Sequence, residues 1–122
     1  MPESILIVDD EPAIRKSTRK FLESETQYEV CGEAVDGVDA IEKARDLRPD
    51  LIILDMSMPR MNGLQAARVL RKEMGNVPII LFTMHVSAVS SAEVQACVSS
   101  VVCKTDGLVT LVKQVDALLE HA

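Results

Sequence analysis

The sequence predicts an α/β fold: a (βα)5 three-layer sandwich in which a five-stranded parallel sheet lies between two layers of helices. Short runs of continuously apolar residues recur along the 122-residue chain, at a length typical of strands. The stretches between these runs carry apolar residues at helical spacing. Strands that are apolar throughout and separated by single helices are typical of a parallel sheet covered on both faces.

Five segments have strand character. Four of them are runs dominated by Ile, Leu and Val, residues that fit a buried strand, and the second segment in the chain is the weakest. In chain order the expected strands are 5–8, 28–34, 51–54, 77–82 and 101–103.

The expected helices alternate with these strands, and the last one, with an apolar stripe over residues 108–119, is the best defined. The segment 85–100 is the weakest, because Ser and β-branched Val lower its helix propensity. A helix is still expected there, since a crossover must join two parallel strands. The other helices are indicated by Ile14, Phe21 and Leu22; by Ala40, Ile41, Ala44 and Leu47; and by Leu64, Ala67 and Leu70.

The length predicts one domain over 1–122, because a chain of this size buries one hydrophobic core but not two. The final helix ends the sequence, so no output domain is expected. Cys31, Cys97 and Cys103 form no CxxC pair, which argues against a disulfide framework or a zinc site. We expect all three to be small buried hydrophobes.

The charge of the chain limits its partners. A formal net charge of -6 and a pI near 4.8 disfavour direct binding to nucleic acid, which depends on clustered Lys and Arg. No apolar run approaches the roughly 20 residues that span a bilayer, and the first residues lack the pattern of a signal peptide. We therefore expect a cytoplasmic protein with no membrane or nucleic-acid partner.

Polar side chains follow four of the expected strands. Asp9 and Asp10 follow the first strand and Asp55 follows the third. Thr83 and Lys104 follow the fourth and fifth. In doubly wound sheets, ligands bind beyond the carboxyl ends of the strands, where the strand order reverses. In the flavodoxin-like order 2-1-3-4-5 the first and third strands are neighbours at that point, so the five side chains would share one crevice.

Charge counting in this crevice predicts a divalent metal. Two carboxylates about 5 Å apart repel by roughly 3 kcal/mol at an effective dielectric constant near 20, and a third carboxylate more than doubles this. The single ammonium of Lys104 cannot neutralise three of them. Oxygen ligands favour Mg²⁺ or Mn²⁺ over zinc or copper. With such cations present, Asp55 can act as a nucleophile towards a phosphoryl group, and Thr83 can donate a hydrogen bond to it.

The segments that carry these residues resemble those of a known family. The runs ILIVDDE, DLIILDMSMPRMNG, LFTMH and VVCK are similar, in order and over essentially the whole chain, to the motifs of bacterial response-regulator receiver domains in two-component signalling. The resemblance implies that Asp55 accepts phosphate from a histidine kinase and later loses it by slow self-hydrolysis. It also implies that Asp10, Asp55 and the backbone carbonyl of Ser57 ligate Mg²⁺, with Asp9 assisting through water.

The resemblance assigns further roles around the phosphate. Lys104 would pair with the phosphoryl oxygens, and Thr83 would move towards them in the active state. Ser57 and His85, two places after Asp55 and Thr83, would tune the lifetime of the phosphate. Output would pass through the face formed by the fourth helix, the fifth strand and the fifth helix, to a separate effector protein or a second copy of the chain, or else the phosphate would be relayed to a further protein.

The chain departs from the family pattern around the expected fifth strand, where Val98, Ser99 and Ser100 stand in place of the small Gly or Ala residues common there. Where the family usually has an aromatic residue three places before the lysine, this chain has Val101, so the usual aromatic switch is not expected. Thr105 follows Lys104 in place of a proline, and the bond between them should be trans, because a cis bond costs a non-proline residue about 2.5 to 4 kcal/mol.

Other functions fit the sequence less well than the receiver does. A haloacid-dehalogenase-type phosphatase would have a DxD pattern after its first strand and a cap, whereas this chain has DDE and no remaining length. A pseudo-receiver, which binds partners without phosphorylation, remains the alternative because of Val101. A flavin carrier is disfavoured by the scarcity of aromatic residues. We expect a signalling phosphoacceptor rather than an enzyme, whose partners are a histidine kinase or phosphotransfer protein and an effector.

Overall fold

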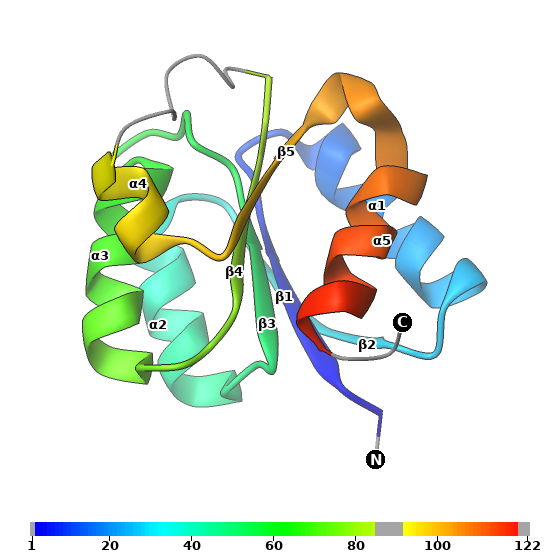
Figure 1. The fold of residues 1–122 in the computed structure, drawn as a ribbon, viewed down its shortest axis with the longest axis horizontal. Coiled ribbons are helices and arrows are strands. Elements are labelled where there is room, and N and C mark those ends of the chain that lie inside the picture. The colour runs from blue at the N-terminus through cyan, green and yellow to red at the C-terminus, as the bar shows by residue number, and fades with distance from the viewer. Residues whose placement is uncertain (1, 85–91, 120–122) are drawn as a thin grey trace.

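Five parallel strands form a single sheet in the order β2-β1-β3-β4-β5, as the sequence predicts (Figure 1). The computed structural model describes residues 2–84 and 92–119. His85 and the first part of the expected fourth helix lie outside the described residues. The strands are β1 (Ser4–Val8), β2 (Glu29–Ala34), β3 (Leu51–Leu54), β4 (Ile79–Thr83) and β5 (Ser100–Cys103).

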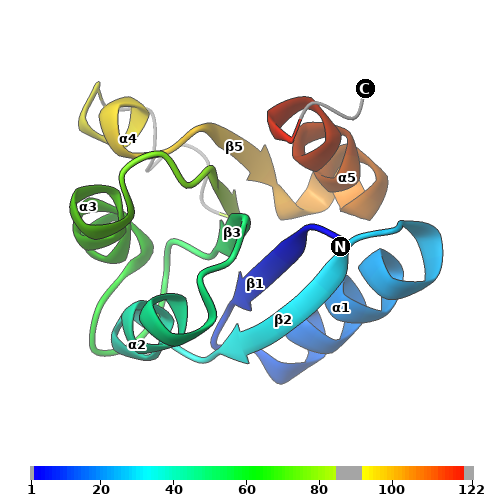
Figure 2. The same cartoon turned by 90° about the horizontal axis from the view of Figure 1, so that it is seen from below.

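Helices cover both faces of the sheet, which confirms the three-layer, flavodoxin-like sandwich. Figure 2 shows α1 and α5 on one face and α2, α3 and α4 on the other. The helices are α1 (Pro12–Glu25), α2 (Gly37–Leu47), α3 (Gly63–Met74), α4 (Ala92–Cys97) and α5 (Gly107–Leu118), and a short 3-10 turn, η2 (Lys104–Asp106), precedes α5.

Local sequence signals set the starts of the helices at the carboxyl edge of the sheet. Pro12 occupies the first turn of α1, where the amide that it lacks would have no helical partner. Asp36 caps α2 by accepting a hydrogen bond from the amide of Asp39. Asn62 and Gln65 form a reciprocal capping box at the start of α3. The helices that follow β1, β2 and β3 therefore begin at defined positions at that edge.

The core consists of two apolar layers that alternate residues of the same strands supply. Leu6, Ile52 and Leu81 point towards α2, α3 and α4, while Ile7 and Ile53 point towards α1 and α5, and all five are almost completely buried. Burying each such side chain stabilises the fold by about 1.5 to 3 kcal/mol. Because shifting a strand by one residue would reverse its two faces, this packing also fixes where each strand ends.

Three smaller expectations can be compared with the structure. The cysteines are free thiols, but the expectation that they are buried is wrong, because all three are partly exposed. The bond between Lys104 and Thr105 is trans, as expected, and no cis peptide bond occurs in the part of the chain that the structure describes. Within that part, every helix is too short or too polar to cross a bilayer.

Candidate functional site

Three carboxylates meet at the carboxyl edge of the sheet. β1 and β3 pair in parallel with Val8 opposite Leu54, so Asp9 and Asp55 leave the two strands side by side. Each of Asp9, Asp10 and Asp55 offers one ligand oxygen, and these oxygens all lie within 4.8 Å of one another. Asp9 and Asp55 are only 2% and 5% exposed, whereas Asp10 is exposed. The cluster therefore has a buried base and an open side.

The ammonium of Lys104 lies against the two buried carboxylates. Its Nζ is 2.6 Å from Asp9 Oδ2 and 3.4 Å from Asp55 Oδ2, and its side chain is only 7% exposed. Burial lowers the pKa of Lys104, but the hydrogen bond to Asp9 and the charges of Asp55 and Asp9 outweigh this and raise the pKa above its ordinary value. Lys104 therefore carries a full positive charge at neutral pH.

Backbone amides orient the same two carboxylates. The amide of Glu11 donates to Asp9 Oδ1 at 2.9 Å, and the amide of Met56 donates to Asp55 Oδ1 at 2.8 Å. The other oxygen of each carboxylate is left to face Lys104. The guanidinium of Arg15 also donates to the backbone carbonyl of Asp9 at 2.7 Å, which fixes the turn after β1. Asp9 and Asp55 are thus oriented by backbone amides as well as by the ammonium of Lys104.

A cavity of about 190 Å³ opens directly onto this cluster. Its lining residues come from the ends of four strands: Asp10, Glu11, Asp55, Ser57, Met84 and Lys104. It lies beyond the strand ends, as the sequence predicts, but of the five side chains expected to share it only Asp10, Asp55 and Lys104 are among the described residues that line it.

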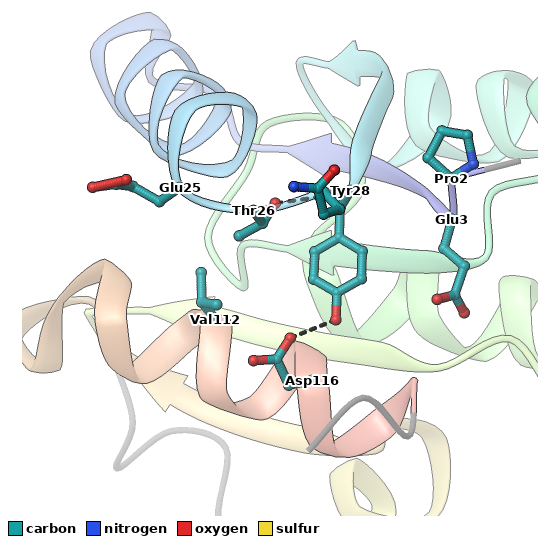
Figure 3. A pocket seen from close by; sticks show the side chains of 8 residues that line it. Pro2, Glu3, Glu25, Thr26, Tyr28, Val112 and Asp116 are labelled. Carbon is teal, nitrogen blue, oxygen red and sulfur yellow. Dashed lines mark hydrogen bonds between the residues drawn. The ribbon is translucent and has the colours of Figure 1, made fainter.

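A larger depression, of about 410 Å³, lies at the opposite end of the strands (Figure 3). Tyr28, just before β2, reaches across it to donate a hydrogen bond to Asp116 on α5. Burial and this hydrogen bond raise the pKa of Tyr28 well above its ordinary value. In sheets of this type ligands bind at the carboxyl ends of the strands, so the smaller, charged cavity is the candidate site.

The remaining predicted site residues differ in how closely they approach the cavity. Ser57 is among the residues that line it. Thr83 ends β4 and is completely buried, and it is its neighbour Met84 that lines the cavity. Val101 packs on the α3–α4 side of the sheet, opposite Leu81. His85 lies outside the described residues.

Sequence reasoning missed two residues that line the cavity. Glu11 directly follows Asp10, and Met84 directly follows Thr83. The same strand-end argument that selected their neighbours would have found both. Met84 is 54% exposed, so an apolar side chain stands at the open side of an otherwise polar cavity.

The donors present fit a hard divalent cation. Three carboxylates and one ammonium leave two negative charges uncompensated in a site whose base is buried. All the ligand atoms are oxygens, which suits Mg²⁺ or Mn²⁺. Asp10, Asp55 and Ser57 line the cavity, while Asp9 is engaged by Lys104, so Asp9 is suited to the outer role that the resemblance implies.

The ionisation of Asp55 opposes folding when no metal is bound. Burial raises the pKa of Asp55, the charge of Asp9 raises it further, and Lys104 offsets only part of this. The folded state therefore holds the Asp55 proton more tightly than the unfolded state does. It follows that the contribution of Asp55 to stability falls as the pH rises from the ordinary aspartate pKa through the raised one.

Replacing Asp55 by Asn should therefore stabilise the metal-free protein in a pH-dependent way. We expect the free energy of unfolding to rise by about 1 to 2 kcal/mol at about pH 7.5, and the gain to shrink towards zero at about pH 3, below the ordinary aspartate pKa, where the carboxyl is mostly protonated in both states. Urea unfolding in the presence of EDTA measures this. Asp46→Asn, at an exposed position on α2, is the control. Equal gains at both pH values would contradict the electrostatic explanation.

Known proteins are similar to this chain in sequence. A protein-glutamate methylesterase/protein-glutamine glutaminase of Pyrococcus abyssi is 42% identical over 92 residues, and response regulator protein VraR of Staphylococcus saprophyticus is 36% identical over 86 residues. These stretches are 75% and 70% of this chain but only 25% and 41% of the two relatives. The chain thus spans less than half the length of either relative.

Solved structures match over nearly the whole chain. Response regulator protein TrrA of Thermotoga maritima, crystallised in complex with Mg²⁺-BeF, superposes with a TM-score of 0.87 at 34% identity and covers 95% of this chain and 98% of its own. A LuxR-family two-component response regulator of Aurantimonas gives a TM-score of 0.88 at 31% identity, covering 99% and 87%. Residues 5–116 match the family described as response regulator receiver domain, and the chain therefore belongs to that family.

Proposed function

We propose that the chain is a phosphoacceptor switch, in which Asp55 receives a phosphoryl group from a phosphohistidine with the help of Mg²⁺ or Mn²⁺. The single observation that carries the proposal is the grouping of Asp55, Asp10 and Lys104 around one cavity at the carboxyl edge of the sheet. Membership of the receiver family supports it, as does the Mg²⁺-BeF complex of the similar TrrA protein.

The transfer requires one nucleophile and a means of balancing charge. A carboxylate oxygen of Asp55 attacks phosphorus, the P–N bond to the histidine breaks, and its electron pair stays on the imidazole. Lys104, whose Nζ lies 3.4 Å from Asp55 Oδ2, would pair with the phosphoryl oxygens. A bound divalent cation, held by Asp10, Asp55 and the carbonyl of Ser57, would neutralise further negative charge on this group.

Hydrolysis of the aspartyl phosphate returns the protein to its unphosphorylated state. Water attacks phosphorus in line with the bond to Asp55, the P–O bond breaks, and inorganic phosphate leaves with the carboxylate restored. Ser57 and Met84 border the cavity from which water must enter. We propose that they influence the rate of this hydrolysis, together with His85. We also propose that Thr83 moves towards the phosphate from its buried position at the end of β4.

The partners follow from this chemistry. The donor is a histidine kinase or a phosphotransfer protein, and the output is a separate effector or a second copy of the chain, contacted through the face of α4, β5 and α5. Val101 takes the place of the aromatic residue usual in the family, so we propose that this face changes through repacking around Val101 and Thr83.

Acetyl phosphate and Mg²⁺ test the proposal directly. Intact-protein mass spectrometry should show a gain of one phosphoryl group on the wild-type chain, and Asp55→Asn should abolish it. The signal should also disappear when EDTA is added before acetyl phosphate. A wild-type chain that gains no mass, and does not bind beryllium fluoride, would instead identify a pseudo-receiver that acts without phosphorylation.

A further inference from the structure

We propose that Arg60 is a positioning residue: its ion pair with Asp36 holds the loop between β3 and α3 in the shape that metal binding at Asp10 and Asp55 requires. This inference rests on the proposed function, because it concerns how the same site is kept in order. Arg60 lies five residues beyond Asp55 and is not one of the described residues that line the cavity.

The backbone at Arg60 is in an unfavourable conformation. Its φ is +64°, in the left-handed region that residues with a side chain seldom adopt. Such a conformation costs about 1 kcal/mol or more and persists where surrounding contacts enforce it. The loop that leaves the acidic cavity is therefore held in its shape by something beyond its own preference.

The ion pair with Asp36 provides that restraint. Arg60 Nε lies 2.7 Å from Asp36 Oδ2, while Asp36 Oδ1 accepts from the amide of Asp39 at 2.9 Å. The Asp36 side chain is 5% exposed and the Arg60 side chain is 61% exposed. The hydrogen bond from Arg60 lowers the pKa of Asp36, so this carboxylate stays charged at neutral pH. A solvent-facing guanidinium thus anchors the loop to the buried cap of α2.

Two neighbouring contacts extend the restraint to the cavity. The amide of Gly37, next to Asp36, donates to the carbonyl of Met61, next to Arg60, at 3.1 Å. A Cβ at Gly37 would lie 2.6 Å from that carbonyl, so the approach depends on glycine. Further along, the amide of Gly63 donates to the carbonyl of Met56 at 2.8 Å and closes the loop. Ser57, which lines the cavity, lies within this closed loop.

The two partners carry opposite charges, and this separates positioning from simple electrostatics. If only long-range charge mattered, losing the positive Arg60 would strengthen the binding of a cation and losing the negative Asp36 would weaken it. If the pair positions the loop, losing either partner weakens binding. The signs of the two effects therefore decide between the explanations.

The test measures the affinity for Mn²⁺ alone, from the electron paramagnetic resonance signal of the free ion. The variants are Arg60→Asn, which tolerates the left-handed backbone, and Asp36→Asn, which keeps a capping side chain at the start of α2. We expect each to raise the Kd for Mn²⁺ by about tenfold. The double variant should be no weaker than the single ones, because the pair acts as a unit.

Arg45→Asn is the matched control. Arg45 on α2 pairs with Glu73 on α3 at 2.6 Å, near the ends of these helices that are distant from the cavity, and its side chain is 56% exposed. The substitution removes the same charge and a similar ion pair at a distance from the cavity, so the Kd for Mn²⁺ should stay within about twofold of wild type.

The outcomes separate this inference from the proposed function. Tighter Mn²⁺ binding by Arg60→Asn, or a Kd equal to that of wild type, would overturn the positioning role even if Asp55 accepts phosphate. Weakened binding in both single variants supports the role even if acetyl phosphate leaves the wild-type chain unmodified. In that second case only the phosphoacceptor proposal would fail.

Discussion

Replacing Lys104 by alanine should destabilise the metal-free protein by about 3 to 5 kcal/mol, the usual cost of breaking a buried ion pair from one side. Asp9 and Asp55 would lose their common cation while remaining almost fully buried. Repulsion between the two carboxylates would then be uncompensated. Urea unfolding in EDTA measures the loss.

Two further variants identify the cause of that loss. Lys20→Ala, at an exposed position on α1, should change the stability by less than about 0.5 kcal/mol. Adding Asp55→Asn to Lys104→Ala should restore part of the stability, because it removes one of the two buried carboxylates that no longer have a cation beside them. A loss in Lys104→Ala that Asp55→Asn leaves unchanged would point to lost packing of the lysine stem instead of charge.

Replacing Gly63 by alanine should be the other large perturbation, with a loss of about 3 kcal/mol or more. A Cβ at Gly63 would overlap the carbonyl oxygen of Asp55 and lie 2.8 Å from the Cα of Met56. Both are backbone atoms, so neither can move aside without displacing the end of β3. Urea unfolding and the Mn²⁺ affinity should both report the change.

Gly75→Ala provides the comparison for that glycine. Gly75 has a φ of +61°, and a Cβ added there would meet no atom within 4 Å. Alanine at this position should therefore lower the stability only through the left-handed backbone, by about 1 to 2 kcal/mol. It should leave the acidic cavity unchanged. If Gly63→Ala were no more destabilising than Gly75→Ala and bound Mn²⁺ normally, the close approach at Asp55 would not be a structural constraint.

The sequence predicts the fold and the centre of the site because both depend on regular patterns. Alternating buried strands and helices leave one arrangement of layers, and Asp9, Asp10, Asp55 and Lys104 follow strands whose ends must share one edge. The expected strands agree with the observed ones to within two residues at each end. The largest difference is at β4, which begins at Ile79, after a proline that has no amide to donate.

The features that the sequence does not predict depend on contacts that no regular spacing of residues indicates. The pairing of Arg60 with Asp36 joins residues 24 positions apart and relies on a left-handed backbone that nothing in the residue type signals. Cys31 and Cys103 are partly exposed because β2 and β5, which carry them, are the edge strands of the sheet. Strand order, rather than hydrophobicity, decides such exposure.

Strand order also divides the reactive groups between the centre and the margin of the sheet. Asp55 follows β3, the middle strand, while Lys104 follows β5, which is hydrogen-bonded on one side only. Asp55 therefore follows a strand that is hydrogen-bonded on both sides, whereas Lys104 follows a strand with one free edge. If Asp55 accepts a phosphoryl group, as proposed, we expect Lys104 and the end of β5 to respond before the middle of the sheet does, at an edge that a partner protein can contact.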